Sequence, residues 1–379
     1  MTPAKRRARK GRLAVALTSH GYGHATRTLA VLKSLVERQP GLDITVSATV
    51  PASLFEGELG ETLLLRHQVY EPGTIQKNCF EVDLEGTRDA YREHLARRKG
   101  LIAAEKEFLA AGKFDGLLVD VPAIPLAAAS GLKIPAAALW NFTWDWILEP
   151  LLQPGDVEPP LARLPEQLRE DYHAAGLHLR LPFSSPRNDL PGVESAPLVS
   201  RRARRTREAT HRILGLASDD HRPLVLLAMG GWSCGEWRSI KVQGCSDFRF
   251  LVVGDVPIVS ASEVRRLPAE LSPDLRFSDL VAASDAVLSK PGYGIASECV
   301  THHVPLLGVE RRGFREAPEL AREMQEFGPF HEISLDDFFA GAWEAPLGRL
   351  ISDRTGWRET PSDGAQQVAD RLLRYFDLG

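Results

Sequence analysis

Two histidines flank a Gly-Tyr-Gly turn in the segment SHGYGHATR, which spans residues 19–27. The segment follows the apolar run 13–17 and leads into a run of helical character. A histidine with an ordinary pKa of about 6.5 can accept a proton at neutral pH. His24 stands where the predicted helix opens, so we expect it to act as a general base; the alternative is a histidine that only steadies the loop. His20 precedes Gly21 and is expected to point back toward the sheet.

Two carboxylates stand near predicted loops that connect strands to helices. Asp120 ends an apolar strand and is followed at once by Val121 and Pro122. We expect it to reach the site as a second catalytic group, with helix capping as the alternative. Glu298 lies in the first turns of the helix after Gly294. Its carboxylate can accept hydrogen bonds from paired hydroxyls such as those of a ribose; the alternative is a favourable charge near a helix N-terminus.

Three glycine-rich loops join predicted strands to predicted helices, at Gly21–His24, Gly230–Gly235 and Gly292–Ser297. A glycine turn brings backbone N–H groups close to an anion, and the helix N-terminus that follows favours negative charge. The first and third loops both contain Gly-Tyr-Gly. Ligands of open α/β sheets bind at the carboxyl ends of the strands, so two facing domains would direct these loops at one cleft.

These loops do not complete the known dinucleotide or Walker motifs. In the first loop Thr26 replaces the third glycine of G-x-G-x-x-G, which argues against NAD binding. In the second loop Gly230 and Gly235 have the Walker spacing, but Glu236 and Trp237 follow instead of Lys-Ser/Thr. A carboxylate where phosphate must be neutralised argues against kinase or ATPase chemistry from this loop.

An aromatic segment, WNFTWDW at residues 140–146, follows another predicted strand. Aromatic faces in a cleft suit stacking on sugars or bases. We therefore expect Asn141 and Trp144 to contact substrate. The alternative is a hydrophobic lid or packing between domains.

Short apolar runs alternate with helical patterns, which is typical of βαβ units and a parallel sheet. The predicted strands are Leu13–Thr18, Ile44–Val50, Gly116–Asp120, Ala136–Leu139, Leu224–Met229, Phe250–Val253, Ala286–Ser289 and Leu306–Val309. The predicted helices span 25–37, 87–111, 123–130, 206–214, 279–284, 295–302, 317–327 and 364–376. The proline-rich residues 150–200 are predicted to form a loop-rich connection. The chain is thus expected to fold as two Rossmann-like α/β domains, residues 1–197 and 198–362, followed by residues 363–379 with the final helix.

Composition and charge restrict the classes of partner. The net charge is −4, so no general attraction to nucleic acid is expected. Basic residues gather within 5–12 and 201–207; they are interpreted as a disordered tail and a solvated helix face, or alternatively as contacts to an anionic membrane surface or acceptor. The four cysteines form no C-x-x-C pair, which suits a reducing cytosol. With no signal-peptide or membrane-spanning pattern, we expect a cytoplasmic protein, with peripheral membrane contact as the alternative.

The pattern as a whole resembles the GT-B glycosyltransferases, most closely family 28-type enzymes such as the peptidoglycan N-acetylglucosaminyl transferase. The resemblance rests on VLLAMGGWSCG at 225–235, LRFSDLVAASDAVLSKPGYGIASECVTHHVPLL at 275–307 and RRGFREAPELARE at 311–323. GYGHATR at 21–27, NFTWDW at 141–146 and SKPGYGIASE at 289–298 are also similar to the N-terminal, glycosyltransferase-like region of plant L-arabinokinases. The resemblance implies two parallel-sheet domains that face a central cleft, with the last helix crossing back onto the N-terminal domain.

The resemblance also implies roles for individual residues. His24 would be the base or orienting group on the acceptor side, where the loop residues Gly21, Tyr22 and Gly23 form a wall. Arg27 would contact acceptor or phosphate. The residues beside the diphosphate would be Gly230, Gly231, Ser233, Gly292, Tyr293, Gly294 and Ile295. Glu298 would bind the ribose, Phe277 would lie near the base, and Arg315 and Glu316 would face the donor sugar.

The function expected from these features is transfer of a sugar from a nucleotide sugar, UDP-linked, to an acceptor that the sequence does not name. The chain contains no Asp-x-Asp motif, and the resemblance implies inverting transfer without a metal or other cofactor. Helix N-termini and backbone N–H groups would stabilise the departing diphosphate. Two alternatives remain open: a nucleotide-sugar-binding module without transfer activity, and a nucleotide-sugar epimerase of the same fold.

Overall fold

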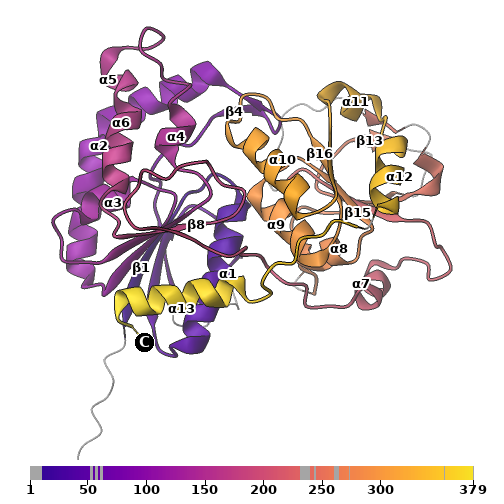
Figure 1. Cartoon of the computed structure of the whole chain (residues 1–379), viewed down its shortest axis with the longest axis horizontal. Helices are drawn as coiled ribbons and strands as arrows, with labels where there is room; N and C mark the ends of the chain where they lie inside the picture. The colour runs from indigo at the N-terminus through magenta and orange to yellow at the C-terminus, as the bar shows by residue number, and fades with distance from the viewer. Residues whose placement is uncertain are drawn as a thin grey trace, which may run out of the picture.

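The structure, a computed structural model, describes residues 11–51, 54–55, 59, 63–230, 240–242, 245–259, 264–272, 274–353 and 355–378. It contains two α/β domains that lie side by side, each built on a parallel sheet (Figure 1). The predicted fold class is confirmed.

The sheet of the first domain has the strand order β3-β2-β1-β6-β7-β8-β9, with every neighbouring pair parallel. Its strands are β1 (Arg12–Leu17), β2 (Asp43–Ala48), β3 (Leu63–His67), β6 (Gly116–Asp120), β7 (Ala136–Trp140), β8 (Leu177–Arg180) and β9 (Val193–Ser195). The central strands β6 and β7 are buried along their whole length. Continuous apolar runs of this kind are expected where helices cover both faces of a parallel sheet.

Helices pack on both faces of this sheet. They are α1 (Tyr22–Arg38), α2 (Leu84–Gly112), α3 (Ile124–Ala129), α4 (Trp144–Leu148), α5 (Pro159–Ala162) and α6 (Leu164–Tyr172). The side chain of Asp83 caps α2 by accepting a hydrogen bond from the N–H of Gly86, which satisfies one of the otherwise unpaired amides of a helix N-terminus.

The prediction that residues 150–200 form a loop-rich connection is wrong. This part of the chain contains α5, α6 and two strands, β8 and β9, that extend the first sheet at one edge. Prolines at helix N-termini and between the short strands break the periodic pattern on which the prediction depended.

The sheet of the second domain has the order β14-β12-β10-β15-β16-β17, again with parallel neighbours. Its strands are β10 (Leu224–Ala228), β12 (Arg249–Val253), β14 (Val264–Leu267), β15 (Ala286–Ser289), β16 (Leu306–Val309) and β17 (Phe330–Ile333), and a separate pair is formed by β11 (Ile240–Lys241) and β13 (Ile258–Val259). Its helices are α7 (Arg207–Leu214), α8 (Phe277–Ala282), α9 (Tyr293–His302), α10 (Glu316–Phe327), α11 (Leu335–Ala340) and α12 (Glu344–Ser352), with the 3₁₀ turn η3 (Cys245–Asp247).

Two segments connect the domains beyond the covalent linker. The final helix α13 (Gly364–Phe376) runs alongside α1 of the first domain (Figure 1). The hairpin of β4 (Gln76–Asn78) and β5 (Glu81–Val82) extends from the first domain to the second. There the side chain of Phe80 is buried beside Phe338, and the N–H of Arg312 donates to the carbonyl of Phe80 at 2.7 Å. The sequence analysis did not predict this hairpin.

Candidate functional site

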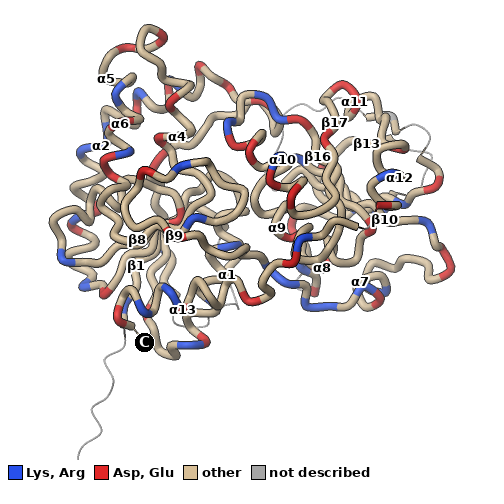
Figure 2. Tube along the Cα trace, viewed as in Figure 1, with Lys and Arg blue, Asp and Glu red and all other residues tan. Residues whose placement is uncertain are grey.

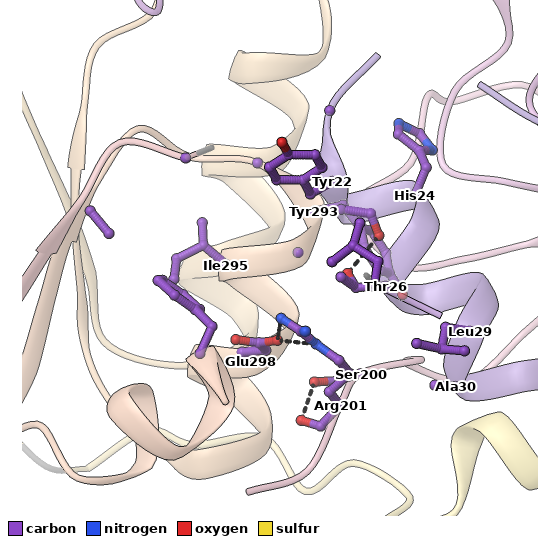
Figure 3. A pocket seen from close by; sticks show the side chains of 18 of the residues that line it. Tyr22, His24, Thr26, Leu29, Ala30, Ser200, Arg201, Tyr293, Ile295 and Glu298 are labelled. Atoms are coloured by element: carbon purple, nitrogen blue, oxygen red, sulfur yellow. Dashed lines mark hydrogen bonds and ion pairs between the residues drawn. The ribbon is translucent and has the colours of Figure 1, made fainter. Parts of the chain in front are cut away.

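A cleft of about 2100 Å³ lies between the domains, at the carboxyl ends of both sheets. The first domain contributes the start of α1 and the residues that follow β3, whereas the second contributes the ends of β10 and β15 and the helices α8 and α9. Figure 3 shows α1 and α9 on opposite sides of the cleft, with His24 on the first and Glu298 on the second. Ligands of parallel α/β domains bind at this edge of the sheet.

The two Gly-Tyr-Gly loops meet in the middle of the cleft. A Cβ atom on Gly23 would lie 3.3 Å from the backbone nitrogen of Gly294, and one on Gly294 would lie 3.2 Å from the Cα of Gly23. The close approach therefore depends on glycine at both positions. Gly21 has a φ of 101°, which a side chain would strain. As a result, two helix N-termini, each carrying partial positive charge, open at one place, an arrangement that favours an anion.

His24 is held by a carboxylate. Its Nδ1 lies 2.9 Å from Oδ1 of Asp120, and its ring contacts the edge of Phe142. In the described part of the chain Nε2 makes no hydrogen bond. Burial and the nearby Arg27 guanidinium lower the pKa of His24 below 6.5, although Asp120 opposes the shift. The imidazole is therefore neutral at pH 7, the form that accepts a proton.

Asp120 lies behind His24 and does not reach the cleft. Its side chain is fully buried and accepts hydrogen bonds from Arg27 at 2.6 and 2.8 Å and from Thr28 at 2.6 Å, besides its contact with His24. Burial opposes its ionisation, but the charge of Arg27 and the hydrogen bonds from Arg27 and His24 hold the pKa of Asp120 below its usual range. The expectation that Asp120 is itself catalytic is corrected: it orients His24, because it touches the site only through that ring.

Arg27 is also displaced from its expected role. Its side chain is buried, with 2% exposed, and it does not line the cleft. It pairs with Asp120, donates to Oδ1 of Asn141 at 2.6 Å, and lies 4.7 Å from the centre of the Tyr293 ring across the domain interface. Contact with acceptor or phosphate is therefore excluded in this arrangement, since the guanidinium is enclosed by these partners.

Asn141 and Glu316, which were expected to contact substrate and the donor sugar, lie together in the cleft lining. The amide of Asn141 donates to Glu316 at 3.5 Å, and Glu316 accepts from Arg311 at 3.4 Å. Arg311 and Lys290 also line the cleft, and both charges act on His20, whose pKa burial lowers to about 3. Neither cation was among the expected site residues, although Lys290 directly follows β15 and Arg311 lies just beyond the end of β16.

The second domain supplies a wall that contains the expected donor residues. Phe277, Gly292, Tyr293, Gly294, Ile295 and Glu298 all line the cleft. Glu298 is buried, and its Oε1 accepts from Arg201 at 2.9 and 3.0 Å (Figure 3). Its Oε2 has no hydrogen-bond partner among the described residues, and burial raises the pKa of this carboxyl. The sequence analysis had placed Arg201 only in a basic run and missed this pairing.

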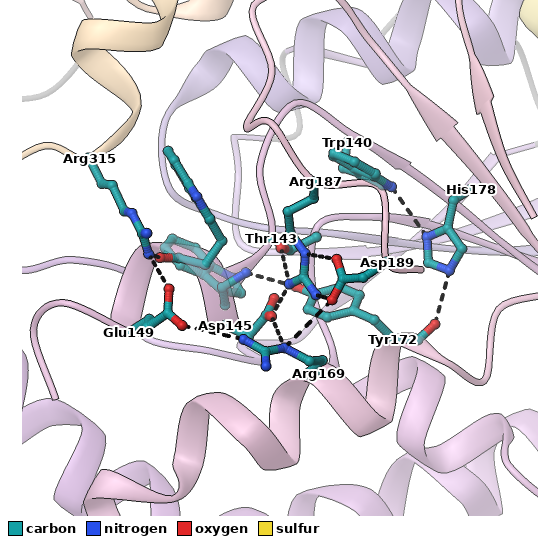
Figure 4. A network of polar contacts seen from close by, with 12 residues as sticks. Trp140, Thr143, Asp145, Glu149, Arg169, Tyr172, His178, Arg187, Asp189 and Arg315 are labelled. Atoms are coloured by element: carbon teal, nitrogen blue, oxygen red, sulfur yellow. Dashed lines mark hydrogen bonds and ion pairs between the residues drawn. The ribbon is translucent and has the colours of Figure 1, made fainter. Parts of the chain in front are cut away.

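The aromatic segment does not form a stacking surface. Trp144 is 1% exposed and does not line the cleft, so its expected contact with substrate is wrong. Trp140, Phe142 and Trp146 are buried as well. A polar network secures the segment: Asp145 pairs with Arg187, and Trp140 donates to His178 at 3.2 Å (Figure 4). These side chains belong to a hydrophobic core of the first domain, so packing within that domain accounts for them.

The side chain of Arg315 contacts the first domain and does not face the cleft. It pairs with Glu149 at 2.9 Å and its guanidinium lies 4.5 Å from the Trp146 ring centre, which joins α10 to the first domain (Figure 4). Because these contacts engage it away from the cleft lining, the expected contact with a donor sugar is corrected. Its neighbour Glu316 takes the cleft-facing position instead.

Several expectations concern other parts of the chain. Gly230 lines the cleft with a φ of 87°, whereas Gly231 and Ser233 lie outside the described residues, as do the basic residues before Gly11. Part of the second basic run is engaged internally: Arg201 with Glu298, and Arg207 with Asp285 at 2.7 Å. Figure 2 shows acidic and basic residues interspersed over both domains.

The described residues contain neither a metal-binding cluster nor a membrane-spanning helix. No group of three or more His, Cys, Asp or Glu side chains in the described ranges is arranged to hold a metal ion. Among the helices built from those residues, we found none with the length and apolar character needed to cross a membrane.

Comparison with known proteins agrees with this architecture. No family model matches the chain. The chain is 30% identical over 368 residues to L-arabinokinase of Arabidopsis thaliana, covering 96% of this chain but 34% of that protein, so it spans about a third of its length. Among solved structures, the calicheamicin glycosyltransferase CalG4 matches with a TM-score of 0.63 at 17% identity, over 98% of this chain and 99% of that one. A UDP-glucosyltransferase from Polygonum tinctorium matches with a TM-score of 0.60 at 14% identity, over 97% and 99%.

These structures are glycosyltransferases of two facing Rossmann-like domains, and the chain has the same GT-B fold. The likeness extends over nearly the whole chain and shows that its two domains share the fold of these glycosyltransferases. The sequence similarity to L-arabinokinase extends over nearly the whole of this chain.

Proposed function

We propose that this protein transfers a sugar from a nucleotide sugar, UDP-linked, to an acceptor hydroxyl, with inversion and without a metal. The observation that carries the proposal is the neutral His24, held by the buried Asp120 beside the point where the N-termini of α1 and α9 meet. A base and an anion-favouring surface are the two parts that such a transfer requires.

The reaction follows from this arrangement. His24 accepts the acceptor hydroxyl proton at Nε2, and the acceptor oxygen forms a bond to the anomeric carbon of the donor. The bond between that carbon and the diphosphate oxygen breaks, and the diphosphate leaves with the electron pair. The N-terminus of α9 and the charges of Lys290 and Arg311 face the developing negative charge. Attack from the side opposite the leaving group inverts the anomeric carbon.

The donor assignment rests on the second-domain wall. The carboxylate of Glu298 on α9 can accept hydrogen bonds from the vicinal hydroxyls of a ribose. Phe277, at the start of the adjacent helix α8, offers an aromatic face on which a base can stack. One similar structure is described as TcCGT1 in complex with UDP, with a TM-score of 0.58 at 14% identity over 97% of this chain and 99% of that one. Together these features favour a uridine diphosphate sugar.

The experiment that tests the proposal has two stages. Thermal stabilisation is measured with UDP, GDP, ADP and dTDP, and then diphosphate release from the corresponding nucleotide sugars is followed with pooled acceptors. Stabilisation by UDP and acceptor-dependent UDP release are expected. A protein that binds a nucleotide but releases no diphosphate with any acceptor would be a binding module instead. If no nucleotide stabilises the protein, the proposal is overturned.

Replacement of Glu298 by glutamine is expected to weaken UDP binding about tenfold, because a charge-assisted hydrogen bond to a hydroxyl becomes a neutral one. Isothermal titration with UDP measures this change. Glu326→Gln on the exposed side of α10 is the matched control and should bind UDP as the wild type does. Equal affinity in Glu298→Gln and in the control would remove Glu298 from the nucleotide site.

The rate of transfer is expected to fall on the acid side only below pH 6.5, because the pKa of His24 is lowered from that value. Protonation removes the base, so kcat/KM decreases as the pH falls through this lowered pKa and is level above it. A pH profile of kcat/KM for the acceptor, recorded at saturating nucleotide sugar, measures this decrease on the acid side. An acid limb centred above pH 6.5 would show that another group, or a solvent-exposed histidine, controls the rate.

A further inference from the structure

The wall of the cleft next to His24 is polar. The segment 71–78, which follows β3 and includes β4, lines the cleft with the side chains of Glu71, Thr74, Gln76, Lys77 and Asn78. Apolar residues of the same segment are fewer: Pro72 and Ile75. An acceptor that approaches His24 from the first domain therefore meets mainly hydrogen-bonding groups.

Direct contacts place this segment beside the catalytic loop. Thr74 Oγ1 lies 3.2 Å from Nε2 of His20, and a Cβ on Gly73 would lie 2.5 Å from Nδ1 of the same ring. His20 directly precedes Gly21, the N-cap of α1, and His24 lies in the first turn of that helix, so the segment and the proposed base line the same part of the cleft. The hairpin that continues from the segment is anchored in the second domain by Phe80, which keeps this wall over the cleft.

Several of these polar groups have hydrogen-bonding capacity that the protein does not use. Among the described residues, the side chains of Gln76 and Lys77 make no hydrogen bond, and Oε2 of Glu71 is buried without a partner. Asn78 uses its Oδ1 to accept from the N–H of Phe80, which leaves its amide N–H groups. An apolar molecule that covered such groups would leave them without hydrogen-bond partners, which opposes its binding.

The aromatic side chains that could stack on a planar acceptor are elsewhere. Trp140, Phe142 and Trp144 are buried in the first domain. Among the Phe, Tyr and Trp residues described in that domain, Tyr22 is the one that lines the cleft. A flat hydrophobic acceptor would thus find one aromatic face and a row of unpaired polar groups.

We propose that the acceptor is a neutral polyhydroxylated small molecule, a free sugar or a polyol, whose hydroxyls are bound by the segment 71–78. The proposal rests on the proposed transfer, since it assigns the other substrate of the same cleft. Hydroxyl groups both donate and accept hydrogen bonds, so one such molecule can pair with the side-chain amides of Gln76 and Asn78 together.

Binding of acceptor pools tests the assignment without knowledge of the donor sugar. Isothermal titration is performed on the protein alone and on the protein saturated with UDP, using glucose, galactose, xylose, arabinose and inositol, and separately 4-nitrophenol, naphthol and a flavonol. At least one member of the first group is expected to bind, and none of the second. Binding of a phenol without any sugar or polyol, or of neither group, would overturn the acceptor proposal.

A matched pair of variants locates the binding. Gln76→Leu keeps side-chain size and is expected to lower the affinity for the bound sugar or polyol about tenfold, the effect of one lost hydrogen bond with its partner left unpaired. Gln167→Leu on α6, outside the cleft lining, is expected to change nothing. Sugar affinity that is equal in the two variants would place the site away from segment 71–78.

The two proposals fail in different ways. If the wild-type protein does not bind UDP, the proposed transfer is contradicted. The sugar and phenol titrations on the protein without UDP still decide the acceptor class in that case. Conversely, UDP binding with phenol but not sugar binding would leave the transfer in place and contradict the acceptor class.

Discussion

His24→Ala is expected to lower kcat for sugar transfer by about 10²–10⁴-fold, the usual contribution of a positioned general base. The affinity for UDP should stay within about threefold of the wild type, because His24 removes a proton from the acceptor and does not hold the nucleotide. Steady-state kinetics with saturating nucleotide sugar, together with titration of UDP, separate the two quantities. The loss should appear in kcat and in kcat/KM alike.

The matched control is His173→Ala, an exposed histidine at the end of α6. It is expected to retain wild-type kcat, so any general effect of removing an imidazole is accounted for. If kcat is unchanged in His24→Ala, the base lies elsewhere. If UDP affinity falls together with kcat, the histidine shapes the nucleotide site instead of moving a proton.

The second large effect concerns Asp120. Asp120→Asn removes the charge that pairs with Arg27, whose guanidinium is enclosed in the interior. Removal of one partner from a buried ion pair typically costs about 3–5 kcal/mol, because the other charge is left uncompensated. We therefore expect the free energy of unfolding in urea to fall by about this amount. Transfer should slow as well, since His24 loses the carboxylate that orients its ring.

Two further variants distinguish charge compensation from a general packing defect. Asp156→Asn breaks the surface pair with Arg88 and should cost about 0–1 kcal/mol. The double variant Asp120→Asn/Arg27→Met removes both charges, so it should be more stable than Asp120→Asn alone. A double variant no more stable than the single one would show that the loss arises from packing and not from the unpaired guanidinium.

The fold could be predicted largely from the sequence, because buried parallel strands are continuous apolar runs. The central strands and the helices between them were located this way, and the parallel arrangement followed from their alternation. Edge strands were missed for a physical reason. β3 begins with the apolar residues Leu63–Leu65, but the run is short and none of its residues is buried. β8 and β9 have only four and three residues and lie among prolines, so they present no continuous apolar run.

The candidate site could be predicted in part. Register places Asp120 opposite Leu17 at the ends of paired strands, which is why a carboxylate after β6 and a histidine after β1 come together. Arg27 lies three residues after His24 on the same helix, and spacing cannot distinguish a side chain that faces the cleft from one directed beneath it. For Trp144, aromatic character suits burial and stacking equally well.

Other members of the site depended on tertiary structure. Arg201 belongs to the linker between the sheets, and its pairing with Glu298 joins residues far apart in the sequence. The hairpin at β4 and β5 depends on the burial of Phe80 in the other domain. Neither contact leaves a local pattern in the chain, because the partner in each case is supplied by a distant element.

The most direct measurement of the central claim is amide hydrogen exchange with and without UDP, read by peptide. The proposal predicts slower exchange in peptides that cover the start of α9, residues 292–298, and the start of α8 near Phe277, and unchanged exchange in α2. These segments form the second-domain wall on which the nucleotide is proposed to bind. UDP that slows no exchange at 292–298, or slows it only outside the cleft, would contradict a nucleotide-sugar site between the two domains.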